Sequence, residues 1–265
     1  MNTPILMLGA GRMGGAMLEG WLRAHAFAAR DLMIRDPMPG PAALAAGEAG
    51  ANLDPTEADI ASAKTVVLAV KPQLWREAAA GIAPMLAADA VVVSIAAGVK
   101  ASDIAQAFGG RRVARVMPTT AVAIGQGTAS LYADDAAALA TARALFEPLG
   151  GVVALGDESA MHAATAVSGS APAYLYAFIE SLEAAGITAG LSPEDASHLA
   201  RSTVTGAAAL LATTGEAPTE LRRQVTSPGG TTEAALNVLL GPKGLQVLMR
   251  EAVGAAVRRS KELGA

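Results

Sequence analysis

The sequence contains no cysteine, which excludes disulfide bonds, a thiolate nucleophile and cysteine-ligated zinc. It has only three histidines, His25, His162 and His198, and they are scattered too widely to suggest a metal site. Aromatic residues make up 3% of the chain and hydrophobic residues 52%, so the excess is mainly alanine, valine and leucine. This composition favours closely packed helices and buried strands. Because the chain has no cysteine and its histidines are scattered, no metal is expected.

Positive charge and long apolar runs are also scarce. The formal net charge of −4 argues against a nucleic-acid-binding surface. The long uncharged stretches, residues 116–133 and 163–179, contain glycine, proline and hydroxyl residues, so neither is expected to span a membrane. The short apolar run at residues 5–8 lacks the preceding basic segment that is typical of a signal peptide. We therefore expect a cytoplasmic protein with no nucleic-acid or membrane partner.

A glycine-rich motif follows the first apolar run. Residues 4–8 predict a short strand, residues 9–14 read G-A-G-R-M-G, and apolar residues then recur at helical spacing from Met13 to Ala24. Strand, G-x-G-x-x-G and helix in that order form the fingerprint of a dinucleotide-binding turn. Its glycines allow a tight turn, the approach of a pyrophosphate and close packing of helix on sheet.

The next predicted strand, residues 31–35, ends in two residues that point to different cofactors. Asp36 lies 22 residues after Gly14, where an acidic side chain would bind the ribose 2′-hydroxyl of NAD. Arg35 would instead pair with the 2′-phosphate of NADP. The residues therefore leave the choice between NAD and NADP open.

Three further apolar runs, residues 65–70, 91–95 and 113–117, alternate with helical patterns. Runs that are apolar on both faces predict an α/β fold, a doubly wound parallel sheet of the Rossmann type with helices on both sides. Ligands of such sheets bind beyond the carboxyl ends of the strands. Those ends include Gly9, Lys71 and the segments 96–98 and 118–120. At that edge Lys71 is equally consistent with a cofactor contact and with an exposed lysine.

The strand patterns stop before residue 158. We therefore expect a dinucleotide-binding domain of residues 1–157 and an all-α substrate and dimerisation domain of residues 158–265. In the second domain, residues 161–186 predict a long helix bent around Gly169 and Pro172.

Two helices further along are also predicted, one that starts near residue 192 and one that follows residues 241–242. Ser192 is expected to be the N-cap of one of them, with Pro193 at its first position. The later part of that helix, residues 202–214, contains no charged residue. A helix that is apolar on all sides must be buried, so this segment predicts a homodimer interface.

The segment 225–233, V-T-S-P-G-G-T-T-E, predicts a helix start with Ser227 as N-cap and Pro228 in the first turn. The two glycines leave backbone N–H groups uncovered, and such groups attract an anion together with the helix dipole. Thr231 and Thr232 add neutral hydroxyl groups that can donate hydrogen bonds. A helix that is merely well capped is the alternative interpretation.

Five motifs together resemble the Δ1-pyrroline-5-carboxylate reductase family over essentially the whole chain. They are G-x-G-x-M-G at 9–14, A-V-K-P at 69–72, S-I-A-A-G at 94–98, V-S-G-S followed by P-A-Y within 167–174, and S-P-G-G-T-T at 227–232. The resemblance implies a Rossmann domain followed by a helical dimerisation domain, often assembled as a pentamer of dimers. It also implies the reduction of a cyclic imine acid to L-proline with NAD(P)H, the last step of proline biosynthesis.

The resemblance also implies roles for single residues. Thr232 matches the threonine whose hydroxyl hydrogen-bonds the ring nitrogen, so it is the expected catalytic residue. Ser227, Gly230 and Thr231 match the loop that holds the substrate carboxylate. The cofactor-binding residues expected from the motifs and the resemblance together are Gly9, Gly11, Arg12, Met13, Gly14, Arg35, Asp36, Thr56, Val70, Lys71, Pro72, Ala97 and Gly98.

Four positions depart from the family pattern. Thr119 stands where the family usually has asparagine, His162 where it usually has aspartate, Ala171 where glycine is usual, and Thr56 where many members have asparagine near the 2′-phosphate. The departures at Thr119, His162 and Ala171 motivate two alternatives, a reductase of a related six-membered imine acid and a dinucleotide-binding sensor without turnover, whereas Thr56 weakens the case for NADP. The residues favour a reductase over a hydrolase, because no Ser/His/Asp or paired-carboxylate pattern is evident and hydride transfer depends mainly on positioning.

Overall fold

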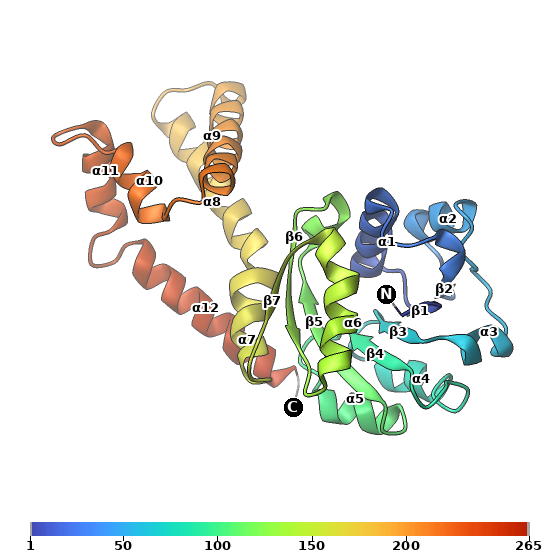
Figure 1. Cartoon of the computed structure of the whole chain (residues 1–265). Helices are drawn as coiled ribbons and strands as arrows, with labels where there is room; N and C mark the ends of the chain where they lie inside the picture. Colours follow the sequence, from blue (N-terminus) through green and yellow to red (C-terminus); the bar gives the residue numbers. More distant parts are fainter. Residues whose placement is uncertain (1, 264–265) are drawn as a thin grey trace. The chain divides into compact units, whose positions relative to one another are not determined.

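The computed structural model describes residues 2–263, which divide into two compact units (Figure 1). The first unit extends to Gly169 and includes the end of the chain from Ala256 onward, and the second unit is Ser170–Ala255. The domain boundary expected between residues 157 and 158 therefore lies inside the first unit. Within residues 2–263, no helix is both long enough and apolar enough to cross a bilayer.

The first unit is built on a seven-stranded sheet with the strand order β2-β1-β3-β4-β5-β6-β7. Its strands are β1 (Ile5–Leu8), β2 (Leu32–Arg35), β3 (Thr65–Leu68), β4 (Val91–Ser94), β5 (Arg112–Pro118), β6 (Gly127–Tyr132) and β7 (Gly150–Ala154). Neighbouring strands are parallel, as predicted, except for β5 and β6. These two are antiparallel because the short turn η2 (Thr120–Ile124) joins them, and a parallel pair would need a longer crossover.

Helices cover both faces of the sheet (Figure 1). They are α1 (Arg12–Ala24), α2 (Pro41–Glu48), α3 (Glu57–Ser62), α4 (Trp75–Ala80), α5 (Ala101–Ala107), α6 (Ala136–Phe146) and α7 (Ala160–Ala164), with short turns η1 (Ala29–Asp31) and η3 (Glu147–Leu149). Along β1, Ile5 and Met7 pack on the face that α1 and α6 cover, whereas Leu6 and Leu8 pack on the face that α4 and α5 cover. Because both faces are buried, the sheet gives the strand ends a rigid support.

The second unit is all-α, as predicted. Its helices are α8 (Ala171–Thr188), α9 (Pro193–Thr214), α10 (Pro218–Gln224), α11 (Thr231–Leu239) and the first part of α12 (Leu245–Glu262). Ser192 is the N-cap of α9, as expected, because its side chain accepts a hydrogen bond from the N–H of Asp195. The long helix expected over residues 161–186 is interrupted near Gly169, where the π-helix η4 (Thr165–Gly169) separates α7 from α8.

A polar cluster in the first unit connects β5, α5, α7 and the end of α12. The guanidinium of Arg115, only 4% exposed, lies 2.9 Å from a carboxylate oxygen of Glu158. The same oxygen accepts a hydrogen bond of 2.6 Å from the N–H of Ala101, at the start of α5. The Nδ1 atom of His162 lies 2.9 Å from the Oγ atom of Ser260 in α12. His162 therefore has a structural role in the first unit. Its contact with Ser260 explains why a polar residue is suitable at this position, where the family usually has aspartate.

The environment of His162 predicts a pH-dependent stability. Burial lowers the pKa of His162, the cations Arg115 and Lys261 lower it further, and Glu158 opposes them. The folded state therefore binds fewer protons than the unfolded chain as the pH falls through the ordinary pKa of 6.5. We expect the contribution of His162 to the free energy of unfolding to be complete above that pH and to decrease below it.

Denaturant unfolding followed between about pH 8 and about pH 5 measures this dependence. His162→Gln should flatten the decline below the ordinary histidine pKa, because it removes the group that titrates. An unchanged slope in that variant would assign the decline to another group.

Candidate functional site

The glycine-rich turn lies between β1 and α1, as predicted. Gly9 has a φ of +88°, a conformation that side chains of L residues rarely adopt. A Cβ atom on Gly14 would lie 2.5 Å from the carbonyl oxygen of Gly9, so the packing of the helix on the turn requires that glycine. A Cβ atom on Gly11 would meet no atom of the described chain within 4 Å. Protein packing does not require Gly11, which is the expected property of a glycine that makes room for a ligand.

The start of α1 fits a pyrophosphate. The helix begins at Arg12, and its N-cap Gly11 provides no side-chain cap. The N–H groups of the first turn therefore lack helical partners, and the helix dipole adds a partial positive charge. Arg12 is exposed beside them and Met13 is partly buried. The turn thus brings together five of the predicted cofactor-binding residues and offers neutral donors to an anion.

The register of the sheet places the ends of further strands beside this turn. Leu8 of β1 pairs with Arg35 of β2 and with Leu68 of β3, and Leu68 pairs with Ser94 of β4. The segments that follow these four strands therefore leave the sheet at one edge. They contain the predicted residues Asp36, Val70, Lys71, Pro72, Ala97 and Gly98. This edge is where ligands of doubly wound sheets bind.

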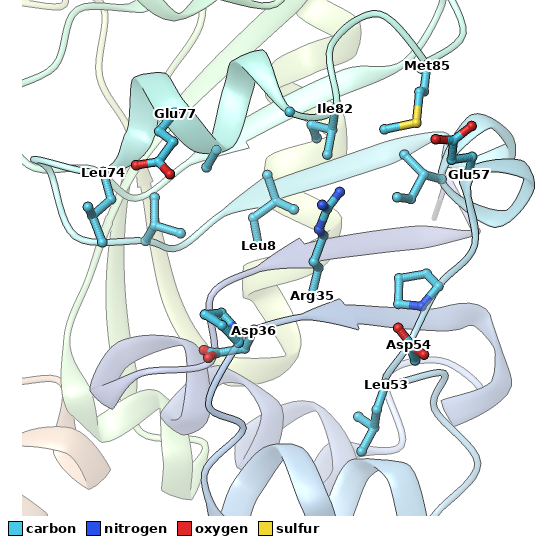
Figure 2. A pocket seen from close by; sticks show the side chains of 16 residues that line it. Leu8, Arg35, Asp36, Leu53, Asp54, Glu57, Leu74, Glu77, Ile82 and Met85 are labelled. Atoms are coloured by element: carbon cyan, nitrogen blue, oxygen red, sulfur yellow. The ribbon is translucent and has the colours of Figure 1, made fainter.

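A pocket of about 820 Å³ lies at this edge (Figure 2). Apolar side chains from α4 and its flanking residues line it, among them Leu74, Ile82 and Met85. Arg35 and Asp36 also line it. Figure 2 shows the Arg35 side chain extending toward Ile82, whereas the Asp36 carboxylate is turned away from Arg35. The apolar wall suits an adenine ring, and among the described residues Arg35 is the single cation of a lining that also includes Asp54, Glu57 and Glu77.

Thr56, another predicted cofactor residue, lies between Pro55 and Glu57, which both line this pocket. It is the N-cap of α3 and forms a capping box with Asp59. Its Oγ1 atom lies 2.7 Å from a carboxylate oxygen of Asp59 and accepts the N–H of Asp59 at 3.2 Å. The hydrogen bond from the Thr56 hydroxyl to this carboxylate is the main cause of the lowered pKa of Asp59. The hydroxyl of Thr56 is therefore used inside the protein, and its cofactor contact stays a prediction.

The segment 227–232 lies in the second unit, at the start of α11. The expectation that Ser227 caps this helix and that Pro228 lies in its first turn is wrong, because the N-cap is Gly230 and the helix begins at Thr231. The reason is a tight turn in which Gly229 has a φ of +70° and the N–H of Gly230 donates to the carbonyl of Ser227 at 3.0 Å. A left-handed residue cannot continue a right-handed helix, so α11 starts only after both glycines.

The later helix start still presents neutral hydrogen-bond donors. Gly230 provides no side-chain cap, which leaves N–H groups of the first turn without helical partners. Ser227 and Thr231 are exposed and Thr232 is half-buried. Within residues 2–263, none of these three hydroxyl groups has a protein partner. An anion with a polar ring atom beside it fits this arrangement. The described chain holds no group of three acidic or histidine side chains suited to a metal ion.

Two polar contacts at these sites were not foreseen from the sequence. The N–H of Gly229 donates to the carboxylate of Glu233 at 2.8 Å. The spacing of Glu233 after the N-cap is that of a capping box, so this contact has a local sequence signal. The carboxylate of Asp36 accepts the N–H of Ala10 at 2.6 Å. That contact joins residues 26 apart in sequence, and no local pattern indicates it.

Two departures from the family pattern have structural explanations in the fold. The Oγ1 atom of Thr119 accepts the N–H of Thr128 at 3.0 Å, and the N–H of Thr119 donates to the carbonyl of Thr128 at 3.0 Å. Thr119 therefore extends the pairing of β5 with β6, and it is buried. Ala171 is the first residue of α8, where helical geometry accepts alanine readily.

Comparison with known proteins agrees with both halves of this description. Residues 158–263 match a family model described as pyrroline-5-carboxylate reductase dimerisation, and residues 4–98 match one described as NADP oxidoreductase, coenzyme F420-dependent. A pyrroline-5-carboxylate reductase of Pseudomonas aeruginosa is 39% identical over 269 residues, which cover 99% of this chain and 98% of that protein.

Solved structures agree as well. A pyrroline-5-carboxylate reductase from Coxiella burnetii has a TM-score of 0.90 and 30% identity, with 100% of both chains covered. The pyrroline carboxylate reductase of Plasmodium falciparum, solved with NADP bound, has a TM-score of 0.84 and 26% identity, with 100% of this chain and 99% of that chain covered.

The doubly wound sheet, the glycine-rich turn and the pocket at the strand ends define an oxidoreductase that uses a nicotinamide dinucleotide. The helical unit and the S-P-G-G-T-T segment narrow this class further. The chain belongs to the pyrroline-5-carboxylate reductase family.

Gly11 and Gly14 are expected to respond differently to the same substitution. Gly11→Ala should raise the Kd for NADPH by about tenfold, since its new methyl group takes the space left for the ligand, and should change the Tm little. Gly14→Ala should lower the free energy of unfolding by about 1–3 kcal/mol, because its Cβ atom meets the Gly9 carbonyl. Fluorescence titration and thermal unfolding measure both quantities. Unchanged NADPH affinity in Gly11→Ala would remove Gly11 from the cofactor site.

Proposed function

We propose that this protein reduces 1-pyrroline-5-carboxylate to L-proline by hydride transfer from NAD(P)H, the final step of proline biosynthesis. The observation that carries the proposal is the combination, in one chain, of a glycine turn open to a pyrophosphate with a helix start rich in neutral donors. Relatives named for this reaction match the chain from end to end, which supports the same assignment.

We assign cofactor binding to the edge of the sheet at which the predicted residues gather. The first turn of α1 would hold the pyrophosphate through backbone N–H groups, and the pocket beside Arg35 would hold the adenosine end. Ala97 and Gly98, at the end of β4, are small enough for a flat ring to approach the backbone. When bound, the reduced nicotinamide supplies the hydride.

We assign substrate binding to the segment 227–232. Ser227, Thr231 and the unpaired N–H groups of the helical turn that follows Gly230 would hold the carboxylate of the imine acid, because hydroxyl and amide donors stabilise an anion without titrating near neutral pH. Thr232 would donate its hydroxyl hydrogen to the ring nitrogen. This hydrogen bond withdraws electrons from the C=N bond and makes its carbon a better hydride acceptor.

A steady-state assay with pyrroline-5-carboxylate tests the proposed reaction. We expect turnover with both reduced cofactors, followed by the loss of nicotinamide absorbance, and a higher kcat/KM with NADPH because Arg35 places a cation in the pocket. The six-membered imine acid is the control substrate. A preference for the larger ring would contradict the assignment, and cofactor binding without substrate-dependent oxidation would identify a sensor instead.

The role of Thr232 predicts a selective loss of activity. Thr232→Ala should lower kcat/KM by about 100-fold, the usual effect of removing one donor from a polarised reacting group, and should leave the Kd for NADPH nearly unchanged. Thr232→Ser keeps the hydroxyl and should restore most of the activity. Unchanged turnover in the alanine variant would remove Thr232 from the mechanism.

We also propose that the protein forms a homodimer through its C-terminal helices. The match to a dimerisation family over residues 158–263 supports an oligomer. Many large apolar side chains on these helices are exposed in the single chain, and contact with a second copy would remove them from water. They are Leu175, Tyr176, Phe178, Leu182, Leu199, Leu210, Leu211, Val238, Leu239, Leu245, Leu248 and Met249. The pentamer of dimers, the cytoplasmic location and the division into domains of residues 1–157 and 158–265 stay predictions.

A further inference from the structure

Asp36 connects two loops at the end of β2. One carboxylate oxygen, Oδ2, accepts the N–H of Ala10 at 2.6 Å, and the other, Oδ1, accepts the N–H of Met38 at 2.8 Å. Ala10 belongs to the glycine-rich turn, whereas Met38 belongs to the loop that leads to α2. Each oxygen of one side chain therefore holds a different loop. Hydrogen bonds of this kind, from N–H to a carboxylate, are roughly twice as strong as those between neutral groups.

A second hydrogen bond joins the same two parts of the chain. The N–H of Gly9 donates to the backbone carbonyl of Arg35 at 3.0 Å. Consecutive N–H groups of the turn, those of Gly9 and Ala10, are thus held by consecutive residues at the end of β2. The hydrogen bond to Arg35 uses the backbone carbonyl, so a substitution of the Arg35 side chain does not remove it. The hydrogen bond to the Asp36 carboxylate, in contrast, is lost when that side chain is replaced.

The two loops also form the walls of a second, smaller pocket of about 410 Å³ at the start of α1. Its lining includes Ala10, Gly11 and Arg12 from the glycine-rich turn and Met38, Gly40 and Pro41 from the loop before α2. The carboxylate of Asp36 holds one residue from each wall. It therefore fixes the separation of the walls beside the N–H groups that we assign to the pyrophosphate.

Arg35 differs from Asp36 in both direction and partners. Successive residues at a strand end point to opposite sides, and Figure 2 shows the Arg35 side chain extending across the larger pocket, away from Asp36. In the described part of the chain, the Arg35 guanidinium forms no ion pair, although Asp54 and Glu57 line the same pocket. Its charge is therefore available to a ligand, whereas the Asp36 carboxylate is engaged by the protein.

We propose that Asp36 is a positioning residue, which holds the glycine-rich turn in place for the pyrophosphate of either cofactor, and that Arg35 discriminates between NADPH and NADH. This inference rests on the proposed use of a nicotinamide dinucleotide. In the sequence, Asp36 indicates NAD and Arg35 indicates NADP, and the inference resolves this conflict by giving the two residues different roles. Overall affinity depends on Asp36, and selectivity depends on Arg35.

The test is the affinity of Asp36→Asn for three ligands, measured by titration. The amide keeps one acceptor oxygen and replaces the other with a donor, so one of the two N–H contacts must be lost. We expect the Kd for NADH and the Kd for NADPH to rise by a similar factor, about tenfold, so that their ratio stays within about twofold. Adenosine 2′-phosphate lacks the pyrophosphate, and its Kd should change by less than about twofold.

Two matched variants act as controls. Glu48→Gln removes the same charge from an exposed position at the end of α2 that lines neither pocket, so it should leave the Kd for NADH unchanged. Arg35→Gln should raise the Kd for NADPH and for adenosine 2′-phosphate by about tenfold and leave that for NADH within about twofold.

A ribose-binding role for Asp36 gives the opposite pattern. In that case Asp36→Asn would weaken NADH while NADPH binding stayed unchanged or improved, and this result would overturn the inference. A similar rise in the Kd for adenosine 2′-phosphate would also overturn it, because a distorted turn alone does not weaken the binding of a ligand without a pyrophosphate. Wild-type protein that binds NADPH but does not turn over pyrroline-5-carboxylate would contradict the proposed reaction, and the three Kd values would still decide the role of Asp36.

Discussion

The register of four parallel strands is the constraint on which the dinucleotide site depends. Because Leu8 is aligned with Arg35 and with Leu68, and Leu68 with Ser94, the segments after β1, β2, β3 and β4 must emerge together. A shift of one residue would turn buried side chains of both faces to the opposite side and lose the two apolar cores. Core packing thus fixes the relative positions of backbone groups that themselves contribute nothing to the core.

The features that the sequence predicted are those that local patterns determine. Apolar runs located the strands, since strands buried on both faces need no polar alternation, and the glycine spacing located the turn. Ser192 and Pro193 were placed correctly because capping depends on a few neighbouring residues. The helices α2 and α3 were not predicted. Both are short, and α2 is rich in alanine and lacks a clear apolar stripe.

The features that the sequence did not predict depend on backbone conformation or on distant partners. Ser227 and Pro228 have the composition of a helix start, but the left-handed conformation of Gly229 delays the helix until Thr231. Asp36 has the position of a ribose-binding residue, and only the fold shows that its carboxylate reaches Ala10. The antiparallel direction of β6 likewise follows from the length of its connection to β5 rather than from any pattern within the strand.

The chemistry of the proposed reaction requires little of individual side chains. Hydride transfer from a bound cofactor requires no strong acid or base from the protein, so neutral hydroxyl groups and backbone N–H groups are sufficient donors. Backbone donors are insensitive to the side chain that carries them, provided the turn keeps its shape. The shape of the turn depends on contacts such as those of Gly14 and Asp36, whereas the polar groups of Thr119 are satisfied within the fold. In this protein, the geometry of the backbone is therefore the main requirement of the site.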